Sequence, residues 1–391
     1  MAIATSILGF PRIGARRELK FAQEGFWSGK IDAAALQSCA QAIRLMNWRT
    51  LAQRGLSTLP SNDFSLYDQM LDTSVMLGAI PAVYGWRGGA VGLDTYFAMA
   101  RGTRGENSVP ALEMTKWFDT NYHYLVPELS KRQDFSLSST KPLDEYREAK
   151  AAGFETRPVL IGPVTWLKLA KAKDQSFDPI ELLPGIIPVY AEILRQLHAA
   201  GAKSVQMDEP ILTLDLSERE RAAFGTAYSQ LTQAIPSLKL TLTSYFGGLG
   251  DNLDTVLQLP VAGLHLDLVR DPGQLEPILK KAPSSLALSL GVIDGRNVWR
   301  ADLNTVLDTV EPAVQRFGGE RFTIASSCSL LHAPIDLALE EDLDPDLKNW
   351  LAFGLQKVDE IVLLGRALDA GRASVKEELT QSAAAAASRL A

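Results

Sequence analysis

Short apolar segments rich in β-forming residues recur along the chain, and longer stretches with the periodicity of amphipathic helices separate them. Residues 158–163 are apolar on both faces of the pleat, as expected for a strand in a sheet that is covered on both sides. Residues 186–199 place Val189, Ile193 and Leu197 four positions apart, which predicts a helix with one buried face. Alternating strands and helices predict parallel strands joined by crossover helices.

Nine segments qualify as strands, one more than an eight-stranded barrel needs. They are residues 6–11, 64–67, 117–124, 158–163, 204–208, 238–245, 263–269, 287–293 and 322–327. We therefore expect an α/β fold of the (β/α)8 TIM-barrel type. One of the nine predicted segments is then either an extra strand outside the barrel or a wrong strand prediction. Residues 77–110 are rich in glycine and lack periodicity, which predicts an excursion inserted into the barrel. We expect residues 1–375 to form the barrel and the small, featureless residues 376–391 to form a linker.

Composition is that of an ordinary globular protein with a large core: 46% of the 391 residues are hydrophobic and 22% are charged. The net charge of -7 argues against a general nucleic-acid surface, which carries a basic excess. The two cysteines, Cys39 and Cys328, form no CxxC pattern, so a reducing cytoplasm is the expected compartment. The first residues lack a signal-peptide pattern and no apolar run is long enough for a membrane span, so neither is expected.

Two basic turns follow predicted strands. After residues 6–11, a Pro/Gly turn leads to Arg16, Arg17 and Lys20, where a helix is expected to begin. Cations at a helix N-terminus suit an anion, so this turn predicts a site for a multiply negative small molecule at the end of a barrel strand. The alternative is a solvated charged face. After residues 287–293, Arg296 and Arg300 could hold a phosphate or a carboxylate, but the motif is weak alone.

An aromatic segment, residues 113–124, carries the polar side chains Lys116, Asp119, Asn121 and His123 among four aromatic rings. Rings that supply contact area and a few polar atoms that fix orientation are typical of a small-molecule pocket. An aromatic strand with one edge facing solvent explains the same pattern. Lys116 would be a further cation for the anion site of the basic turn after residues 6–11.

Two other strand ends carry reactive groups. Asp208 and Glu209 end an apolar strand, where barrel enzymes place acid/base or ligand-binding residues. Because neighbouring strand residues point to opposite faces, at most one of them faces the pocket, and helix capping is the other interpretation. Cys328 and His332 follow the last strand; they are too few for a zinc site, and a buried, inert thiol is favoured over a nucleophile.

Eight motifs, in order, resemble the N-terminal half of cobalamin-independent methionine synthase. They are LGFPRIGxRRELK, EMTKWFDTNYHY, IGPVTWL, QMDEP, TSYF, GLHLDLV, DGRNVWR and SSCSLLHxP. The resemblance covers residues 1 to about 375. It implies one of two (β/α)8 barrels in an enzyme that transfers a methyl group from 5-methyltetrahydropteroyltri-L-glutamate to L-homocysteine, making L-methionine. It also implies that the catalytic residues, the Zn2+ and the homocysteine site belong to a C-terminal barrel absent from this chain, toward which residues 376–391 would lead.

The resemblance carries a set of folate-binding residues onto this sequence. They are Arg17, Glu18, Leu19, Lys20 and Lys116, with Asn121 carried over because it lies beside the same motif. The triglutamate tail is a multiply charged anion, and each charge-assisted hydrogen bond to it would contribute about 1.5–3 kcal/mol. This barrel would thus hold the tail and brace the partner barrel.

The resemblance implies no metal in this chain. Residues 243–246 occupy the place where the C-terminal barrel supplies a histidine and a cysteine to zinc, and Cys328 resembles its last cysteine ligand. One remaining ligand is too few, so we expect no bound cofactor and no methyltransferase activity from this chain alone. Asp208 and Glu209 would then be inherited strand-end residues.

Two other classes of function remain open at this point. A self-sufficient barrel enzyme of the uroporphyrinogen-decarboxylase type would need an arginine cluster, which Arg12, Arg16, Arg17 and Arg300 could supply. A non-catalytic scaffold domain would retain only docking surface.

Overall fold

Eight parallel strands form the centre of the molecule. The computed structural model describes residues 3–173 and 177–390. The strands are β1 (Ala4–Ser6), β2 (Leu59–Ser61), β6 (Thr156–Ile161), β8 (Ser204–Asp208), β9 (Lys239–Thr243), β10 (Gly263–Asp267), β11 (Ala287–Ile293) and β12 (Phe322–Ser326). Their spatial order is β1-β12-β11-β10-β9-β8-β6-β2, and a parallel bridge between Ser6 and Thr58 joins the two ends. The sheet therefore closes into the predicted (β/α)8 barrel.

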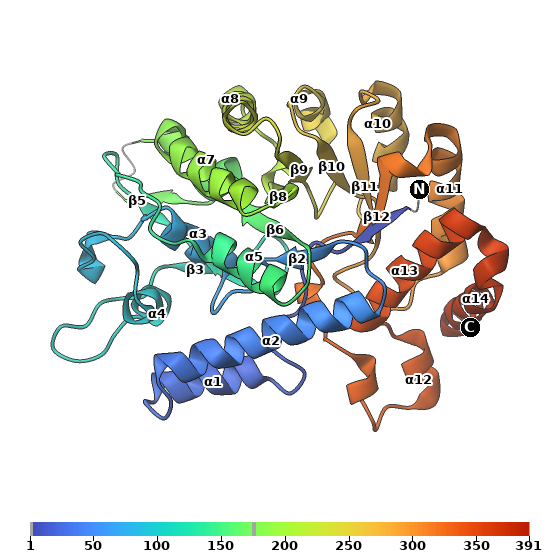
Figure 1. Ribbon diagram of the computed structural model, residues 1–391, viewed down its shortest axis with the longest axis horizontal. Coiled ribbons are helices and arrows are strands. Elements are labelled where there is room, and N and C mark those ends of the chain that lie inside the picture. Colours follow the sequence, from blue (N-terminus) through green and yellow to red (C-terminus); the bar gives the residue numbers. More distant parts are fainter. Residues whose placement is uncertain (1–2, 174–176, 391) are drawn as a thin grey trace.

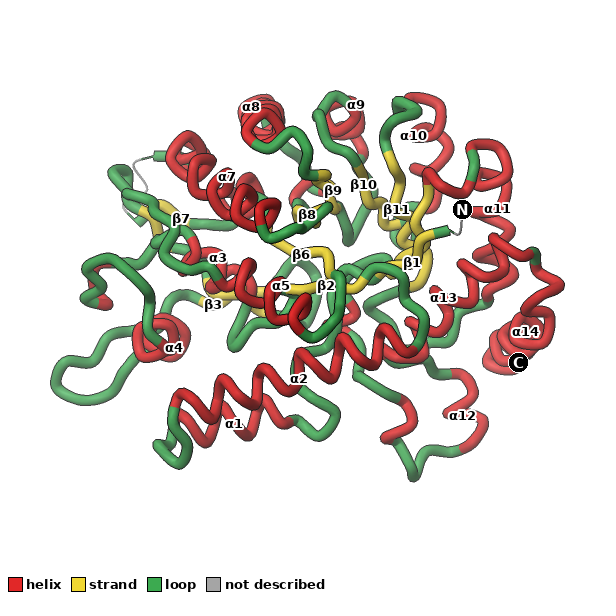
Figure 2. Tube along the Cα trace, in the orientation of Figure 1, coloured by secondary structure: helices red, strands yellow, loops and turns green. Residues whose placement is uncertain are grey.

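Helices surround this sheet (Figures 1 and 2). They are α2 (Ala33–Gln53), α3 (Gln69–Met76), α5 (Lys141–Ala151), α6 (Pro163–Lys168), α7 (Leu183–Ala199), α8 (Glu218–Ala234), α9 (Leu253–Leu257), α10 (Leu275–Lys281), α11 (Leu303–Phe317) and α13 (Gly354–Ala370). The predicted helix at 186–199 lies within α7, where Val189, Ile193 and Leu197 are all buried. Within the part of the chain that the structure describes, no helix is both long and apolar enough to cross a membrane.

Seven of the nine predicted strands correspond to barrel strands, and two predictions are wrong. Residues 204–208 and 287–293 coincide with β8 and β11. The second barrel strand is β2, so residues 64–67 form a loop beyond its end. Residues 117–124 are mostly the turn of a hairpin outside the barrel, between β3 (Met114–Lys116) and β4 (His123–Leu125). Aromatic residues favour strands, but here the rings pack around a turn, which explains the ninth candidate.

The excursion expected at residues 77–110 lies between β2 and β6, and it contains a helix, α4 (Leu93–Arg101), that the sequence did not predict. Phe97 of α4 packs edge-on against Trp27 of α1 (Glu18–Trp27), with ring centroids 5.4 Å apart. With Leu36 and Leu71, these side chains belong to a second hydrophobic cluster beside the barrel core. The excursion continues through the hairpin to β5 (Glu128–Leu129), which pairs with β7 (Lys171–Ala172), a short strand that follows β6 and α6.

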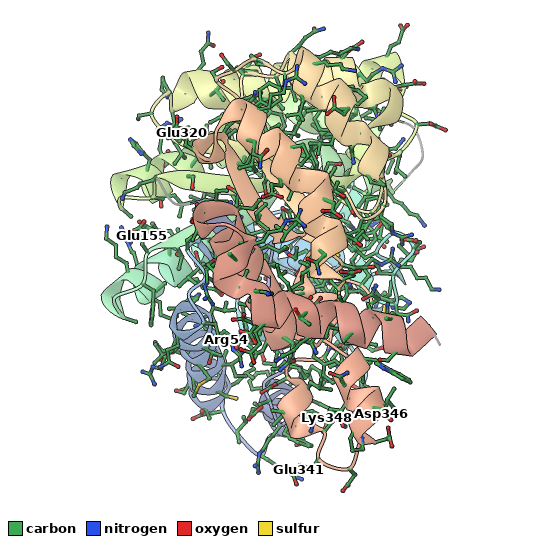
Figure 3. All side chains as sticks on the ribbon, turned by 90° about the vertical axis from the view of Figure 1, so that its right-hand side faces the viewer. Arg54, Glu155, Glu320, Glu341, Asp346 and Lys348 are labelled. Atoms are coloured by element: carbon green, nitrogen blue, oxygen red, sulfur yellow. The ribbon has the colours of Figure 1, made fainter. Side chains whose placement is uncertain are left out.

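The last segment is helical instead of featureless, because α14 spans Lys376–Leu390. Ser382 accepts a hydrogen bond from the Leu303 N–H at 3.0 Å, and the indole of Trp350 donates to the Ser388 hydroxyl at 2.8 Å. Trp350 ends α12 (Pro345–Trp350), whose Asp346 and Lys348 lie beside α14 in Figure 3. A helix here agrees with the high helix propensity of alanine, and its role as a linker stays a prediction.

Candidate functional site

The C-terminal ends of the barrel strands surround a small cavity of about 60 Å3. Its walls include Asp63 after β2, Asp208 at the end of β8, Tyr245 after β9 and His332 after β12. Trp117 of the β3–β4 hairpin covers it. A cavity of this size admits only a few waters and cannot hold a folate.

Of the two carboxylates at the end of β8, Asp208 faces this cavity. Its Oδ1 accepts a hydrogen bond from Gln206 at 2.8 Å, and its Oδ2 accepts one from the Tyr245 hydroxyl at 3.2 Å. Burial raises the pKa of Asp208 to about 7, against the opposing effect of these hydrogen bonds. A carboxyl that titrates near neutrality could move a proton, but the small cavity leaves a substrate no room beside it.

Glu209 points the other way and caps α6. Its carboxylate accepts hydrogen bonds from the backbone N–H groups of Val164 and Thr165, at 3.2 and 2.7 Å, and from the Tyr228 hydroxyl at 2.9 Å. A Cβ on Gly162 would lie 2.1 Å from this carboxyl, so only glycine permits the approach. The prediction that at most one carboxylate faces the pocket is confirmed, and capping is the role of Glu209.

The β3–β4 hairpin lies across the mouth of the barrel. The carboxylate of Asp119, at its tip, pairs with Arg296 at 2.7 Å and with Arg270 at 3.1 Å. The ring of Phe118 packs on Phe246 with centroids 5.5 Å apart. The aromatic residues of the predicted pocket therefore pack against the barrel, and the polar residues of the tip remain at its rim.

The RELK segment lies after β1, at the predicted end of the barrel, but α1 begins at Glu18, so Arg16 and Arg17 precede the helix instead of lying in its first turn. Arg17 precedes the helix as its N-cap residue, with φ of 65°, and Glu18 accepts a hydrogen bond from the Arg16 N–H at 2.9 Å. Leu19 is buried, whereas Lys20 is exposed and lies 3.8 Å from Glu24. Leu19 thus anchors the turn, and the cations beside it face solvent.

The structure brings the hairpin and the basic turn together through Arg12. Its guanidinium donates hydrogen bonds to the carbonyl of Tyr67 and, at 2.7 Å, to the hydroxyl of Tyr122. Tyr122 follows Asn121, which is exposed and lines a cavity of about 300 Å3 with Arg296 and His332. The loop after β1 and the hairpin therefore meet at Arg12 and Tyr122.

Three of the cations have no acidic partner. Within residues 3–173 and 177–390, no carboxylate lies at ion-pair distance from Arg16, Arg17 or Lys116, and all three are exposed. Lys20 has only the weak, exposed pair with Glu24. Unpaired, exposed cations attract polyanions, and the role of these residues in binding the tail stays a prediction.

Cys328 has the burial expected of an inert thiol. It is fully buried against Gly295, and burial raises the pKa of its thiol above the ordinary range. Burial also lowers the pKa of His332 to about 4, and this ring packs edge-on against Tyr122 and Phe246. Among the described residues, no three His, Cys, Asp or Glu side chains are grouped to hold a metal. The residues present do not fit a zinc site.

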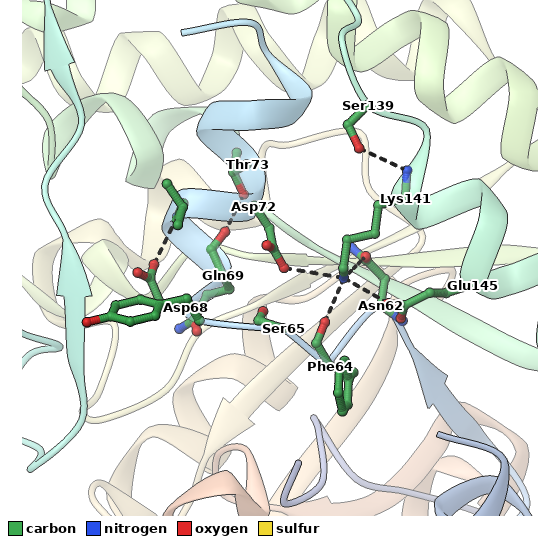
Figure 4. Close-up of polar contacts among 12 residues, drawn as sticks. Asn62, Phe64, Ser65, Asp68, Gln69, Asp72, Thr73, Ser139, Lys141 and Glu145 are labelled. Carbon is green, nitrogen blue, oxygen red and sulfur yellow. Dashed lines mark hydrogen bonds and ion pairs between the residues drawn. The ribbon is translucent and has the colours of Figure 1, made fainter. Parts of the chain in front are cut away.

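A buried ionic network beside the mouth has no counterpart among the sequence predictions. The Lys141 ammonium lies 3.3 Å from Asp72 and 3.0 Å from Glu145, and it donates to Asn62 at 2.8 Å and to the Phe64 carbonyl at 2.6 Å (Figure 4). Nothing in the sequence indicates that residues 62, 72 and 141 meet. The network fixes α3 and α5 next to the loop that carries Asp63.

Two of the four arginines that a porphyrinogen site would need are engaged in different places. Arg12 binds the carbonyls of Ser65 and Tyr67, whereas Arg300 donates to Asn349 at 3.1 Å next to α12. The hypothesis of a uroporphyrinogen-decarboxylase-like enzyme thus keeps only Arg16 and Arg17 of its predicted cluster.

Fold and site together define an α/β barrel with a small cavity at its mouth and a cationic rim. The family model for the N-terminal domain of cobalamin-independent synthase matches residues 4–318. The chain belongs to this family.

Curated relatives carry the name 5-methyltetrahydropteroyltriglutamate–homocysteine methyltransferase. The protein from Rhodopseudomonas palustris is 60% identical over 99% of this chain and 51% of its own length. The one from Caulobacter vibrioides is 58% identical over 100% of this chain and 52% of its own length. The chain therefore spans about half the length of the curated relatives it matches.

Solved structures agree on the fold. A B12-independent methionine synthase from Shewanella sp. W3-18-1, in complex with selenomethionine, superposes with a TM-score of 0.63 at 13% identity, over 97% of this chain and 99% of that one. A methyltransferase from Methanosarcina mazei superposes with a TM-score of 0.52 at 11% identity, over 93% of each chain.

Proposed function

We propose that this chain is the N-terminal barrel of a two-barrel methyltransferase that makes L-methionine from L-homocysteine and 5-methyltetrahydropteroyltri-L-glutamate. Family membership and the names of relatives twice its length support the reaction. This barrel binds the triglutamate tail and braces the C-terminal barrel, which holds the zinc and the homocysteine. The chain alone has no methyltransferase activity.

One observation carries the role of this half: exposed cations lie both in the turn after β1 and on the hairpin at the mouth of the barrel, and among them, within the described residues, only Lys20 has an acidic partner, the exposed Glu24. Arg17 and Lys20 come from the turn after β1, and Lys116 comes from the hairpin. A triglutamate tail presents several carboxylates spaced along a flexible chain, so cations spread over two elements match it better than a single cluster. Charge-assisted contacts of this kind contribute about 1.5–3 kcal/mol each where water is excluded.

In the part of the chain that the structure describes, the mouth of this barrel has neither the space for a pterin nor a reactive thiol, and we therefore assign the chemical step to the other barrel. Its cavity of about 60 Å3 is too small for a pterin, and the thiol of Cys328 is buried with a raised pKa. In the proposed enzyme, a zinc ion outside this barrel would stabilise the homocysteine thiolate. The residues of this chain act on substrate position and affinity.

Titration with 5-methyltetrahydropteroyl triglutamate and monoglutamate tests the proposal, with the chain alone and mixed with the second half of the Rhodopseudomonas palustris relative. We expect the mixture to bind the triglutamate more tightly than the monoglutamate. Alanine at Arg17 and Lys20 should remove the difference, whereas alanine at Lys203 and Lys239, exposed at the opposite end of the barrel, should not. Absence of triglutamate binding in both samples would refute the tail-binding role.

A further inference from the structure

Asp119 is the only acidic residue of the hairpin turn, and two arginines from separate loops hold it. Arg296, after β11, donates to its carboxylate at 2.7 Å and to its backbone carbonyl at 2.9 Å. Arg270, after β10, donates to the other carboxylate oxygen at 3.1 Å. Arg296 thus grips both the side chain and the main chain of one residue, which fixes the turn more firmly than a single exposed ion pair would.

Ring packing reinforces this grip. The guanidinium of Arg296 lies 5.2 Å from the centre of the Phe246 ring. The ring of Phe118 packs on the same Phe246 ring, with centroids 5.5 Å apart. Phe118 has φ of 54°, a left-handed conformation that is costly for a large side chain. The turn holds this conformation while its ring is docked on the barrel, so docking and turn shape depend on each other.

The hairpin itself is too short to hold its own shape. Its two strands pair through only three residue pairs, ending with Lys116 opposite His123. A two-stranded hairpin is marginal in water without further packing. We call the contacts of Arg270 and Arg296 with Asp119 the clasp. Lys116 is three residues before Asp119 and Asn121 is two after it, so the clasp determines where both of these side chains lie.

We infer that Asp119, clasped by Arg270 and Arg296, is a positioning residue that holds the hairpin on the barrel mouth so that Lys116 faces the substrate tail. This inference rests on the proposed function. Asp119 repels the tail by its own charge, so it acts through the hairpin and not by contact with the substrate. Asp119 also engages Arg270 and Arg296, two arginines that would otherwise be available to the tail carboxylates.

Two variants that break the clasp with opposite changes of charge separate positioning from bulk electrostatics. Asp119→Asn makes the mouth more positive, and Arg296→Gln makes it less positive. Kinetics are measured in a two-barrel enzyme that joins this chain to the second half of the Rhodopseudomonas palustris relative. If Asp119 positions Lys116, both variants raise the KM for the triglutamate, by about 3- to 10-fold, and leave the monoglutamate KM within about twofold.

Hydrogen exchange of the same variants reports on docking directly. Amides of residues 117–122, including the Trp117 N–H that donates to the Tyr122 carbonyl at 2.8 Å, should exchange faster in both variants. Asp119→Glu keeps a carboxylate and should restore most of the protection. Asp254→Asn, which breaks an exposed pair with Lys281 at 2.8 Å on α9 and α10, is the matched control and should change neither readout.

Failure of the inference and failure of the proposed function give different results. Opposite shifts of the triglutamate KM in the two clasp variants, or unchanged exchange of the hairpin amides, would overturn the positioning role. If Lys116→Ala also leaves the triglutamate KM unchanged, the proposed role of Lys116 itself is wrong, and the inference about Asp119 is overturned with it. If Lys116→Ala raises that KM while both clasp variants do not, only the inference about Asp119 is overturned.

Discussion

Asp208→Asn should change the pH dependence of stability in a predictable direction. Asparagine keeps the shape of the side chain, and its carbonyl can still accept the hydrogen bond from Gln206. Its amide can donate to the Tyr245 hydroxyl in place of the present bond. The substitution therefore removes the ionisation of this group with little change in packing.

The magnitude follows from the raised pKa. Burial raises the pKa of Asp208 from 3.8 to about 7. Because the folded pKa is the higher one, the folded state binds more protons between these values, and stability falls as pH rises through that window. Ionising Asp208 in the folded protein then costs about 4 kcal/mol, of which about 3 kcal/mol develops between pH 5 and pH 8. The asparagine variant has no carboxyl to ionise at this position, so it does not lose this stability as pH rises.

Urea unfolding followed by circular dichroism at pH 5 and pH 8 measures the effect. The free energy of unfolding of the variant, minus that of the wild type, should be larger at pH 8 than at pH 5 by about 3 kcal/mol, which means that the variant gains stability relative to the wild type as pH rises. Taking the difference cancels the other buried carboxyls, which titrate in both proteins. A difference that is equal at the two pH values would show that Asp208 is not a buried acid with a raised pKa.

Three further outcomes are expected. Glu209→Ala should lower the free energy of unfolding by about 2–4 kcal/mol in urea titrations, because three buried donors lose their acceptor; a loss below about 1 kcal/mol would contradict the capping role. Lys141→Met should cost about 3–5 kcal/mol by the same assay, because Glu145 keeps a buried charge with one cation fewer, and stability equal to the wild type would refute the network. A maleimide should label Cys39 but not Cys328 in the native protein, and rapid labelling of both thiols would show that Cys328 is accessible.

Strand prediction succeeded where a barrel strand has five or more residues and an apolar face, as at residues 204–208 and 287–293. It failed at β2, which is only three residues long, because the aromatic loop at residues 64–67 has a higher β propensity than the strand. Helix α4 was missed because the glycines around it conceal its short apolar face. Local patterns do not encode how far an excursion folds back onto the barrel.

The candidate site was predicted as separate pieces that only the fold relates. The basic turn and the aromatic segment stood out as clusters of charge and rings, but no pattern indicated that Arg12 joins them through Tyr122. The sequence also could not show that Asp208 and Glu209 have different tasks, since this depends on which face of β8 meets α6. The folate-binding roles of Arg17 to Lys20, Lys116 and Asn121 stay predictions.

The central claim is that this barrel recognises the glutamate tail of the substrate. The most direct test measures the KM for the triglutamate and monoglutamate substrates in the two-barrel enzyme, before and after alanine replaces Arg17 and Lys20. The account predicts a KM for the triglutamate raised by about tenfold or more, with the monoglutamate KM nearly unchanged. Equal effects on both substrates would show that these cations do not bind the tail.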